Sequence, residues 1–351
     1  MITQKAGATG ALFSLAMGVA TAQSPGTWAS LAPFPEPREE MVGSAAGGRM
    51  YAFAGLVPFW KPAGVVCEYD PAANKWTQKK PMALAAHYIA LTELNGKIYI
   101  FGSFVYPQQG AAAWVPINNA WEYDPANDTW KALAPMPTRR GVAAAAAVDG
   151  KVYVVGGGTL AHGAKEGYLD FTTRQNVFGT VEEYDPKTNT WRQRASMPTP
   201  RNHVAIGAVG GKVYVVGGRV GAVFISKGSD IAQVEAYDPA TDTWCPPLAR
   251  TPTARSGVSF GVVNGKTVVA GGEWQDTVIQ ATVRAFEAYD PASHSWTRLP
   301  SMTIARHGVA GAAIGNRFFA VSGDVQSSGT GVAVSTASAD AFKFAIEKRN
   351  Q

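Results

Sequence analysis

One short pattern recurs five times along the chain, and a repeat of about fifty residues restricts the fold more than any local feature. Each copy holds Tyr-Asp-Pro and, seven residues after the Tyr, a Trp. The tyrosines are Tyr69, Tyr123, Tyr184, Tyr237 and Tyr289, and the tryptophans are Trp76, Trp130, Trp191, Trp244 and Trp296. A second column holds pairs of small residues: Ala54-Gly55, Gly102-Ser103, Gly156-Gly157, Gly217-Gly218, Gly271-Gly272 and Ser322-Gly323. These columns predict one small structural unit repeated along the chain.

Each unit is expected to be a four-stranded antiparallel sheet. The β-branched runs 152–155 and 213–216 end at a Gly pair, and Asp149-Gly150 is a hairpin turn before one of them. Asp-Pro-x-x-x-x-Trp is a tight connection between two further strands, because Pro fixes φ at its start. The first strand of a unit is small and apolar, as in 141–148, and small side chains suit strands that crowd around an axis.

The two ends of the chain are predicted to share a sheet. Trp28 has no Tyr-Asp-Pro before it, although it lies ten residues before Arg38, the same spacing as from Trp130 to Arg140. The segment 339–344 reads as a third strand with no fourth strand after it. Pairing it with a strand at 27–31 would complete the last sheet and remove an open edge. The count is then six sheets.

The Tyr-x6-Trp spacing, the small-residue pairs and the unit length resemble the kelch repeat. The resemblance covers Trp28 to Ile346. It implies an all-β protein, a six-bladed β-propeller with four antiparallel strands per blade, in a single domain over 23–351. WD40 repeats fit less well, since their Gly-His and Trp-Asp signatures are missing. The second blade departs from the pattern with Gly102-Ser103 and with Ala86 where other blades have Arg.

The first 22 residues have the pattern of a secretory signal. Lys5 precedes an apolar stretch over 11–20, and Ala20-Thr21-Ala22 matches a small-x-small cleavage site. We therefore expect a cleaved signal peptide at 1–22 and a periplasmic or secreted protein. The apolar stretch is too short for a permanent span, and no other run approaches about 20 apolar residues, so no stable membrane insertion is predicted.

Composition narrows the partners and cofactors. The net charge is +5 with no long Lys/Arg run, which disfavours nucleic acid. The only cysteines, Cys67 and Cys245, have no zinc spacing, and no phosphate-binding or dinucleotide motif is found. We predict no metal and no cofactor. Cys67 lies inside the repeat, so a copper–radical oxidase with a linked Cys–Tyr is disfavoured.

The insertions identify a working face. The spacing from the small pair to the Tyr varies as 15, 21, 28, 20 and 18 residues, so the extra residues lie between the second and third strands. In an up-and-down sheet those loops open on the same face as the link between blades. The loops carry aromatic or polar residues that suit sugar stacking or peptide docking: Phe59, Trp60, Phe104, Tyr106, Trp114, His162, Tyr168, Phe171, Phe178, Phe224, Glu273 and Trp274. The alternative is that these rings pack their own loops.

A charged column reaches the same face. Sixteen residues before five of the small pairs stand Arg38, Arg140, Arg201, Arg255 and Arg306. Around a ring they would surround one channel mouth, where guanidinium groups favour a carboxylate or another anion. The structural alternative is that each Arg bonds the carbonyls of neighbouring loops. Glu39, Glu40 and Glu273 lie at this face and could pair with the Arg residues or act as acids and bases.

Three histidines lie beside the Arg column in alternate blades. His87 and His307 follow the column by one residue and His203 by two. Three imidazoles around an axis would suit a metal, but the offset turns His203 to the other side of its strand. Hydrogen-bonding, acid–base and purely structural roles remain open for them.

These features predict a secreted or periplasmic kelch-repeat binding protein. The expected ligand at the long-loop face is a carbohydrate, a small anionic molecule or a partner protein. The predicted ligand-binding residues are Arg38, His87, Arg140, Arg201, Arg255, Arg306, His307, Trp60, Trp114 and Trp274. The alternative is an enzyme: six-bladed kelch-like proteins include the N-acetylneuraminate epimerase type, which implies mutarotation of an acidic sugar. The catalytic candidates would then be Glu40, His203 and Glu273.

Overall fold

The computed structural model describes residues 25–57, 60–106, 114–160, 175–223, 228–276, 278–327 and 333–345. The predicted signal peptide at 1–22 lies outside this range, and so do five residues of the aromatic loops: Phe59, His162, Tyr168, Phe171 and Phe224. Within these ranges no helix is long and apolar enough to cross a membrane.

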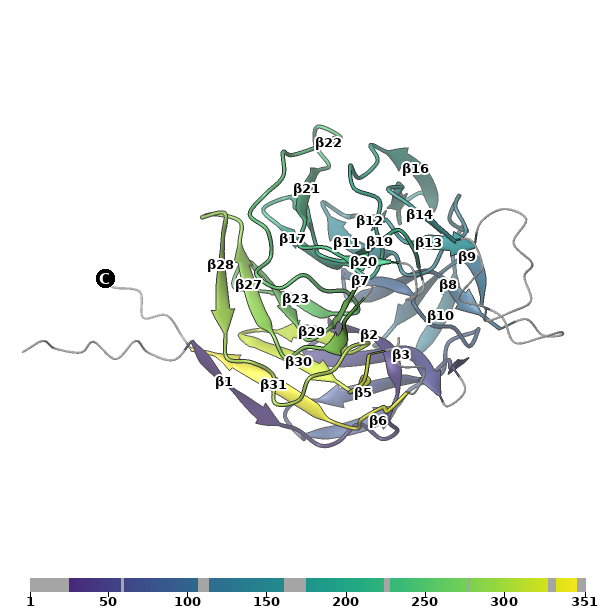
Figure 1. The fold of residues 1–351 in the computed structure, drawn as a ribbon. Helices are drawn as coiled ribbons and strands as arrows, with labels where there is room; N and C mark the ends of the chain where they lie inside the picture. Colours follow the sequence, from purple (N-terminus) through teal and green to yellow (C-terminus); the bar gives the residue numbers. More distant parts are fainter. Residues whose placement is uncertain are drawn as a thin grey trace, which may run out of the picture.

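Six four-stranded antiparallel sheets are arranged around one axis, which confirms the predicted all-β, six-bladed propeller (Figure 1). Blade 1 contains β2 (Glu39–Ala46), β3 (Arg49–Val57), β5 (Val66–Asp70) and β6 (Lys75–Gln78), with β4 (Lys61–Pro62) paired to the end of β3. Blade 2 contains β7 (Ala90–Leu94), β8 (Lys97–Val105), β9 (Val115–Asp124) and β10 (Thr129–Ala132). Blade 3 contains β11 (Ala144–Val148), β12 (Lys151–Val155), β15 (Val181–Asp185) and β16 (Thr190–Arg194).

The remaining blades repeat this order from the axis outward. Blade 4 contains β17 (Ala205–Val209), β18 (Lys212–Val216), β21 (Val234–Asp238) and β22 (Thr243–Trp244). Blade 5 contains β23 (Ser259–Val263), β24 (Lys266–Ala270), β27 (Phe286–Asp290) and β28 (Ser295–Leu299). Blade 6 contains β29 (Ala310–Ile314), β30 (Arg317–Val321), β31 (Ala339–Phe344) and, as its outer strand, β1 (Gly26–Ser30).

Blade 6 closes the ring with strands from both ends of the chain, as predicted. β1 pairs antiparallel with β31 from Gly26 opposite Phe344 to Ser30 opposite Asp340. In Figure 1 the purple β1 lies directly beside the yellow β31. The Trp28 ring packs on Phe342, with ring centroids 5.3 Å apart. This pairing satisfies the backbone groups along β31 that would otherwise form an open edge.

The Trp column joins neighbouring blades. Each indole Nε1 donates to a backbone carbonyl in the link from the preceding blade, at 2.7–3.1 Å. The pairs are Trp28 with Pro300, Trp76 with Ala32, Trp130 with Lys80, Trp191 with Ala134, Trp244 with Ala195 and Trp296 with Ala249. The tyrosines of the repeat also pack across blades: the Tyr123 ring lies 5.8 Å from Phe53 of blade 1. Both columns are therefore structural.

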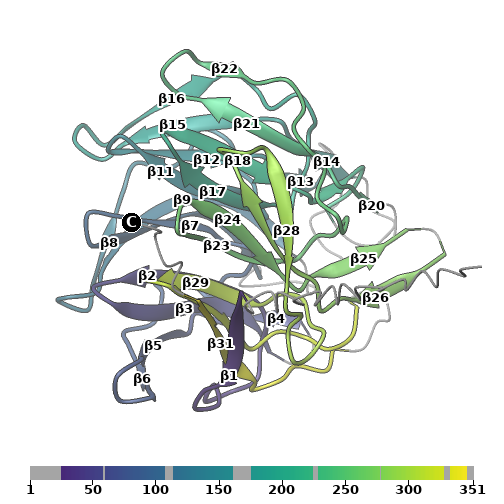
Figure 2. The same ribbon diagram turned by 90° about the vertical axis from the view of Figure 1, so that its left-hand side faces the viewer.

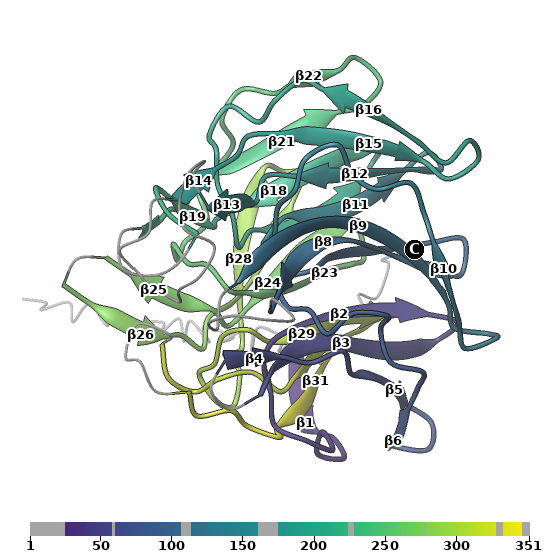
Figure 3. The same cartoon turned by 90° about the vertical axis from the view of Figure 1, so that its right-hand side faces the viewer.

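The long loops gather at one end of the propeller. Blades 3, 4 and 5 extend there into two-stranded hairpins: β13 (Gly158–Leu160) with β14 (Gln175–Val177), β19 (Arg219–Val220) with β20 (Ser229–Asp230), and β25 (Glu273–Gln275) with β26 (Gln280–Thr282). Figures 2 and 3 show these hairpins on one side of the molecule, with the β5–β6 and β15–β16 turns on the other. We call this side the loop face.

The first strands approach closely around the axis. A Cβ on Gly311 would lie 2.3 Å from Ser259 Oγ and 2.8 Å from the backbone nitrogen of Phe260 in blade 5. Gly261 lies on an equivalent strand, but a Cβ there would meet its nearest atoms at 3.3–3.4 Å. Only a Cβ on Gly311 would meet backbone atoms of the neighbouring strand, and these cannot move aside as a side chain can.

We therefore expect Gly311→Ala to lower the free energy of unfolding by about 1–3 kcal/mol, because overpacking displaces the neighbouring strand. Gly261→Ala is the matched control and should change it by less than about 1 kcal/mol. Urea unfolding of both variants measures the difference. Equal stabilities would contradict the close approach of blades 5 and 6.

Candidate functional site at the loop end of the axial channel

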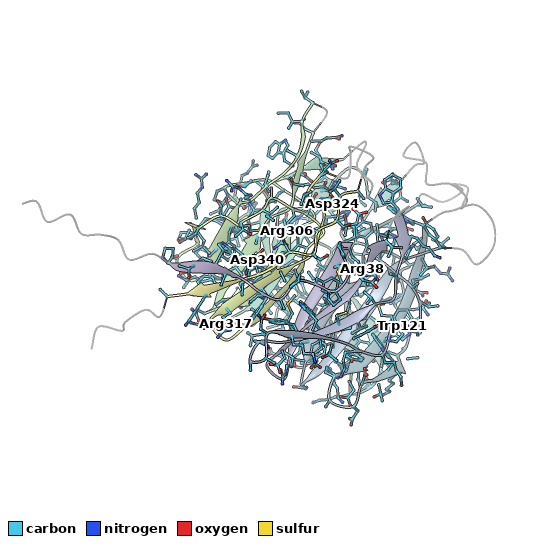
Figure 4. The ribbon with its side chains drawn as sticks, turned by 90° about the horizontal axis from the view of Figure 1, so that it is seen from below. Arg38, Trp121, Arg306, Arg317, Asp324 and Asp340 are labelled. Carbon is cyan, nitrogen blue, oxygen red and sulfur yellow. The ribbon has the colours of Figure 1, made fainter. Side chains whose placement is uncertain are left out.

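Four arginines of the Arg column are bound inside their own blades. Arg255 Nη1 lies 2.7 Å from Glu287 Oε2, and Nη2 donates to the Val269 carbonyl at 3.0 Å. Equivalent pairs join Arg140 to Glu182, Arg201 to Glu235 and Arg306 to Asp340. All four arginine side chains are at most 1% exposed, and Figure 4 shows Arg306 beside Asp340.

Blades 1 and 2 lack this Arg–carboxylate pair, because neither has an acid at the required position of the third strand. Each of these carboxylates stands two residues before the aromatic residue of the third strand, but blade 1 has Cys67 at that position and blade 2 has Trp121. Arg38 accordingly bonds to Glu36, and blade 2, which lacks the acid, also lacks the Arg. The geometry gives Arg140, Arg201, Arg255 and Arg306 a structural role. They do not line the channel mouth as the sequence suggested, because each is held by a carboxylate.

The chemistry of the loop face lies next to the Arg column. The residue after each Arg position pairs with the residue after the small pair of the same blade, and both sets are buried in the described structure. These pairs are Glu39 with Leu56, His87 with Phe104, Gly141 with Gly158, Asn202 with Arg219, Ser256 with Glu273, and His307 with Asp324. The repeat keeps their backbone geometry but changes their chemistry from blade to blade.

The following residue of each blade forms a ring that lines the axial cavity. The ring contains Glu40, Tyr88, Val142, His203, Gly257 and Gly308, and all six have φ between 52° and 61°. For a non-glycine residue this left-handed conformation is unfavourable, and strained backbone clusters at functional sites. The cavity has a volume of about 70 Å³ and continues between the first strands. Only Glu40, Tyr88 and His203 bring polar side chains to the ring.

Blades 4, 5, 6 and 1 contribute an ionic cluster, which we define as Glu39, Glu40, Arg219, Asp230, Glu273, His307 and Asp324. Arg219 Nη2 donates to Glu273 Oε1 at 2.6 Å and to Ser256 Oγ at 2.8 Å, and its Nε lies 3.6 Å from Asp230 Oδ1. Glu273 Oε2 accepts hydrogen bonds from Gln275 and Ser327, both at 2.9 Å. This network joins three blades beneath the loop face.

His307 lies where blades 5, 6 and 1 meet. Its Nε2 is 3.3 Å from Glu40 Oε1 and 3.9 Å from Glu273 Oε2. Burial lowers the pKa of His307, but the charge of Glu273 and the hydrogen bond to and charge of Glu40 outweigh it and raise the pKa to about 10. Burial, aided by the charge of Glu40 and a hydrogen bond to Asp324, raises the pKa of Glu39 to about 9. At neutral pH the cluster thus holds an imidazolium and a protonated Glu39.

The residues that could hold a metal ion differ from the three histidines considered in the sequence. The three predicted histidines do not form a ligand set in the described structure. Instead, ligand-type atoms of Glu39, Glu40 and His307 lie within 4.8 Å of one another. Two carboxylates and an imidazole are a reasonable donor set for a transition-metal ion.

Blade 2 forms an aromatic wall opposite the ionic cluster. The buried His87 ring lies 4.4 Å from both Tyr88 and Trp114 by ring centroids, and burial holds the pKa of His87 well below its usual value. Trp114 Nε1 donates to the Trp60 carbonyl at 3.3 Å, and both rings pack in one apolar cluster, so they join the loops of blades 1 and 2. Trp274 lies apart on β25, with Nε1 3.3 Å from Asp276 Oδ2.

His203 has a defined tautomer. Asn202 Nδ2 donates to the Ala222 carbonyl at 2.9 Å, which turns Asn202 Oδ1 toward Nδ1 of His203. An amide oxygen only accepts, so His203 Nδ1 carries the hydrogen and Nε2 is a lone-pair acceptor. Burial, with the charge of Arg219 next, holds the pKa of His203 well below its usual value and keeps the ring neutral.

The structure thus brings Glu39, Glu40, Glu273 and His307 together, with His203 and His87 on the other walls. Sequence reasoning missed Arg219 and Asp324, which occupy the same column as Glu273. Aligning the residue after each small pair would have revealed them, because that column changes from Leu, Phe and Gly in blades 1 to 3 to Arg, Glu and Asp in blades 4 to 6. Tyr88 was missed because blade 2 has Ala86 in place of the Arg, and Tyr88 stands two residues after it.

The sheet order, ring closure and repeated columns define a six-bladed repeat propeller with its chemistry at one channel mouth. A family model described as Kelch motif matches residues 85–137, 139–198, 200–247 and 254–303, together more than half of the chain. The chain therefore belongs to the kelch-repeat family.

Similar proteins agree with this assignment. Kelch-like protein terF of Aspergillus terreus is 28% identical over 298 residues, covering 81% of this chain and 61% of that protein. Kelch-like protein 25 of Xenopus tropicalis is 26% identical over 279 residues, covering 77% and 42%. The chain spans less than two thirds of the length of these relatives. The solved structure of YjhT superposes with a TM-score of 0.69, covering 88% of this chain and 96% of that one, at 17% identity, which is a likeness of fold.

A structural Arg column predicts that removing one guanidinium acts on stability. Arg255→Met leaves Glu287 buried with only the hydroxyls of Thr251 and Thr253 as partners, and should lower the free energy of unfolding by about 3–5 kcal/mol. Adding Glu287→Leu should recover much of the loss, since no buried charge remains. Arg192→Met removes an exposed guanidinium and is the control; it should change little, because Glu183 keeps Arg194 as a partner. A stable Arg255→Met protein would contradict the structural role.

The ionic cluster predicts falling stability at alkaline pH. Glu39 changes its pKa from 4.5 to about 9 on folding and His307 from 6.5 to about 10, so the folded state holds more protons in these windows. The free energy of unfolding should therefore decrease as the pH rises from about 6.5 to 10. Urea unfolding at several pH values measures this slope, which Glu39→Gln should flatten and Glu36→Gln, at an exposed site, should not. A slope unchanged by Glu39→Gln would be inconsistent with the buried neutral carboxyl.

Proposed function

We propose that the chain is a binding protein for a small polyhydroxylated molecule, in the class of sugars, at the loop end of the axial channel. The observation that carries the proposal is the chemical asymmetry of three neighbouring repeat columns. Elsewhere each column repeats one residue type because it serves the fold. Here buried acids, bases and aromatic rings replace one another around a single cavity.

The arrangement of the site suits sugar recognition. Glu40 and His203 offer hydrogen-bond acceptors to the cavity, and Tyr88 offers a hydroxyl and a ring face. Carboxylates, imidazoles and hydroxyls bond sugar hydroxyl groups, and aromatic rings stack against their C–H faces. Most of the cavity wall below them is apolar, which leaves these groups to set orientation.

The same groups support an enzymatic alternative. Mutarotation needs one group that accepts a proton from the anomeric hydroxyl and one that gives a proton to the ring oxygen. Of the groups that line the cavity, the neutral His203 has a lone pair for the first role, and the Tyr88 hydroxyl carries a proton for the second. A partner protein is a further candidate, because kelch propellers generally bind proteins and the β25–β26 tip exposes Val278 (86%) and Ile279 (55%). We also propose export from the cytoplasm, on the pattern of residues 1–22.

The proposal predicts a thermal shift with sugars that depends on the ring residues. A panel of neutral, amino and acidic monosaccharides should contain a member that raises the unfolding midpoint, since a ligand of the folded state stabilises it. His203→Gln and Tyr88→Phe should each reduce that shift. His294→Gln is the matched control, because His294 lies in an outer turn beside Tyr289. No shift with any sugar, or an equal shift in all variants, would refute the proposal.

A further inference from the structure

We infer that the site takes a cation with N–H donors, a primary ammonium such as that of an amino sugar, between Glu40 and His203 and against the ring of Tyr88. That the ligand is a sugar rests on the proposed function. That it carries a positive charge is argued from the hydrogen-bond donors and acceptors around the cavity. It replaces the anionic ligand that the sequence suggested.

The first step is which polar atoms reach the cavity. Glu40 brings a carboxylate and His203 brings Nε2, which the Asn202 contact leaves as a lone-pair acceptor. In the described part of the chain, no hydrogen bond within the protein involves His203 Nε2 or the Tyr88 hydroxyl, and both residues line the cavity. Each side chain therefore keeps one polar atom that a ligand can bond.

The second step is the charge around the cavity. The ionic cluster has five carboxyl groups and two cationic groups. Both cations are already held by acids, Arg219 by Glu273 and Asp230, and His307 by Glu40 and Glu273. The acidic side chains of the cluster thus outnumber its basic side chains by five to two. This field attracts a cation and repels a carboxylate ligand.

The third step is shape. Gly257 and Gly308 occupy the ring positions of blades 5 and 6, so these two positions contribute no side chain of their own to the mouth. A Cβ on Gly308 would lie 2.5 Å from the Glu40 nitrogen and 3.1 Å from its carboxyl carbon, so the glycine makes room for Glu40. The Tyr88 and His203 rings meet edge to face at 4.9 Å. We place the ammonium group beside these two rings, where it can donate to Glu40 and to His203 Nε2.

The test compares sugars that differ in charge. Isothermal titration calorimetry at pH 7 uses D-glucosamine, D-galactosamine and D-mannosamine, their neutral parents, N-acetyl-D-glucosamine and D-glucuronate, with ethanolamine and ethylene glycol as minimal probes. At least one amino sugar should bind about tenfold more tightly than its neutral parent and its acidic counterpart, because a charge-assisted hydrogen bond is lost in both.

The variant test removes the charge of Glu40. Glu40→Gln should abolish the preference for the amino sugar while binding of the neutral parent changes little. Asp149→Asn removes one charge at an exposed hairpin turn away from the cavity and should keep the preference. If Glu40→Gln does not fold, the comparison of sugars on the unmodified protein still decides the question.

The possible failures are distinguishable. Equal affinity for amino and neutral sugars overturns the ammonium inference and leaves the sugar site standing. Binding of ethanolamine but not ethylene glycol, with no sugar bound, supports the ammonium site and refutes the sugar proposal. A stoichiometric divalent metal in the purified protein, measured by mass spectrometry, would overturn the inference, because the metal would take the Glu40 carboxylate.

Discussion

The structure depends on bringing six sheets to one axis. The first strand of every blade must pass within a few ångströms of its neighbours, so small residues such as Gly43 and Gly311 are needed where backbone meets backbone. This crowding leaves a narrow cavity rather than a wide channel. The polar residues that line this cavity, Glu40, Tyr88 and His203, lie at the mouth, at or just before the start of the first strands.

The propeller itself was predictable from the sequence. Trp and Tyr recur because each blade needs the same ring and the same indole hydrogen bond to its neighbour, so the repeat is legible without coordinates. The pairing of β1 with β31 followed from one unpaired Trp28 and one incomplete sheet. Such positions meet the same physical requirement in every blade, so the same residue types recur at a regular spacing in the sequence.

The site was only partly predictable, for the opposite reason. Glu40, Glu273 and His307 were identified by residue type and position, but the partner of each acid or base is set by blade-to-blade distances that spacing does not reveal. The Arg column was assigned to the mouth because the acids that bind it were not recognised. Each of these acids, such as Glu287, lies about thirty residues further along the chain, in the third strand. The tautomer of His203 depends on one amide contact, which no pattern of sequence encodes.

Closure by the first strand has a consequence for how the molecule is made. Ser30 and Asp340 lie opposite each other although 310 residues separate them. During synthesis β1 is made first, but its partner β31 is made last. Five blades must therefore form while the propeller is still open and β31 has no partner on its outer edge. Contacts of such long range form slowly, and the waiting edge is open to strands from other chains. The assembly of this protein is therefore most vulnerable in its final step, when head and tail meet.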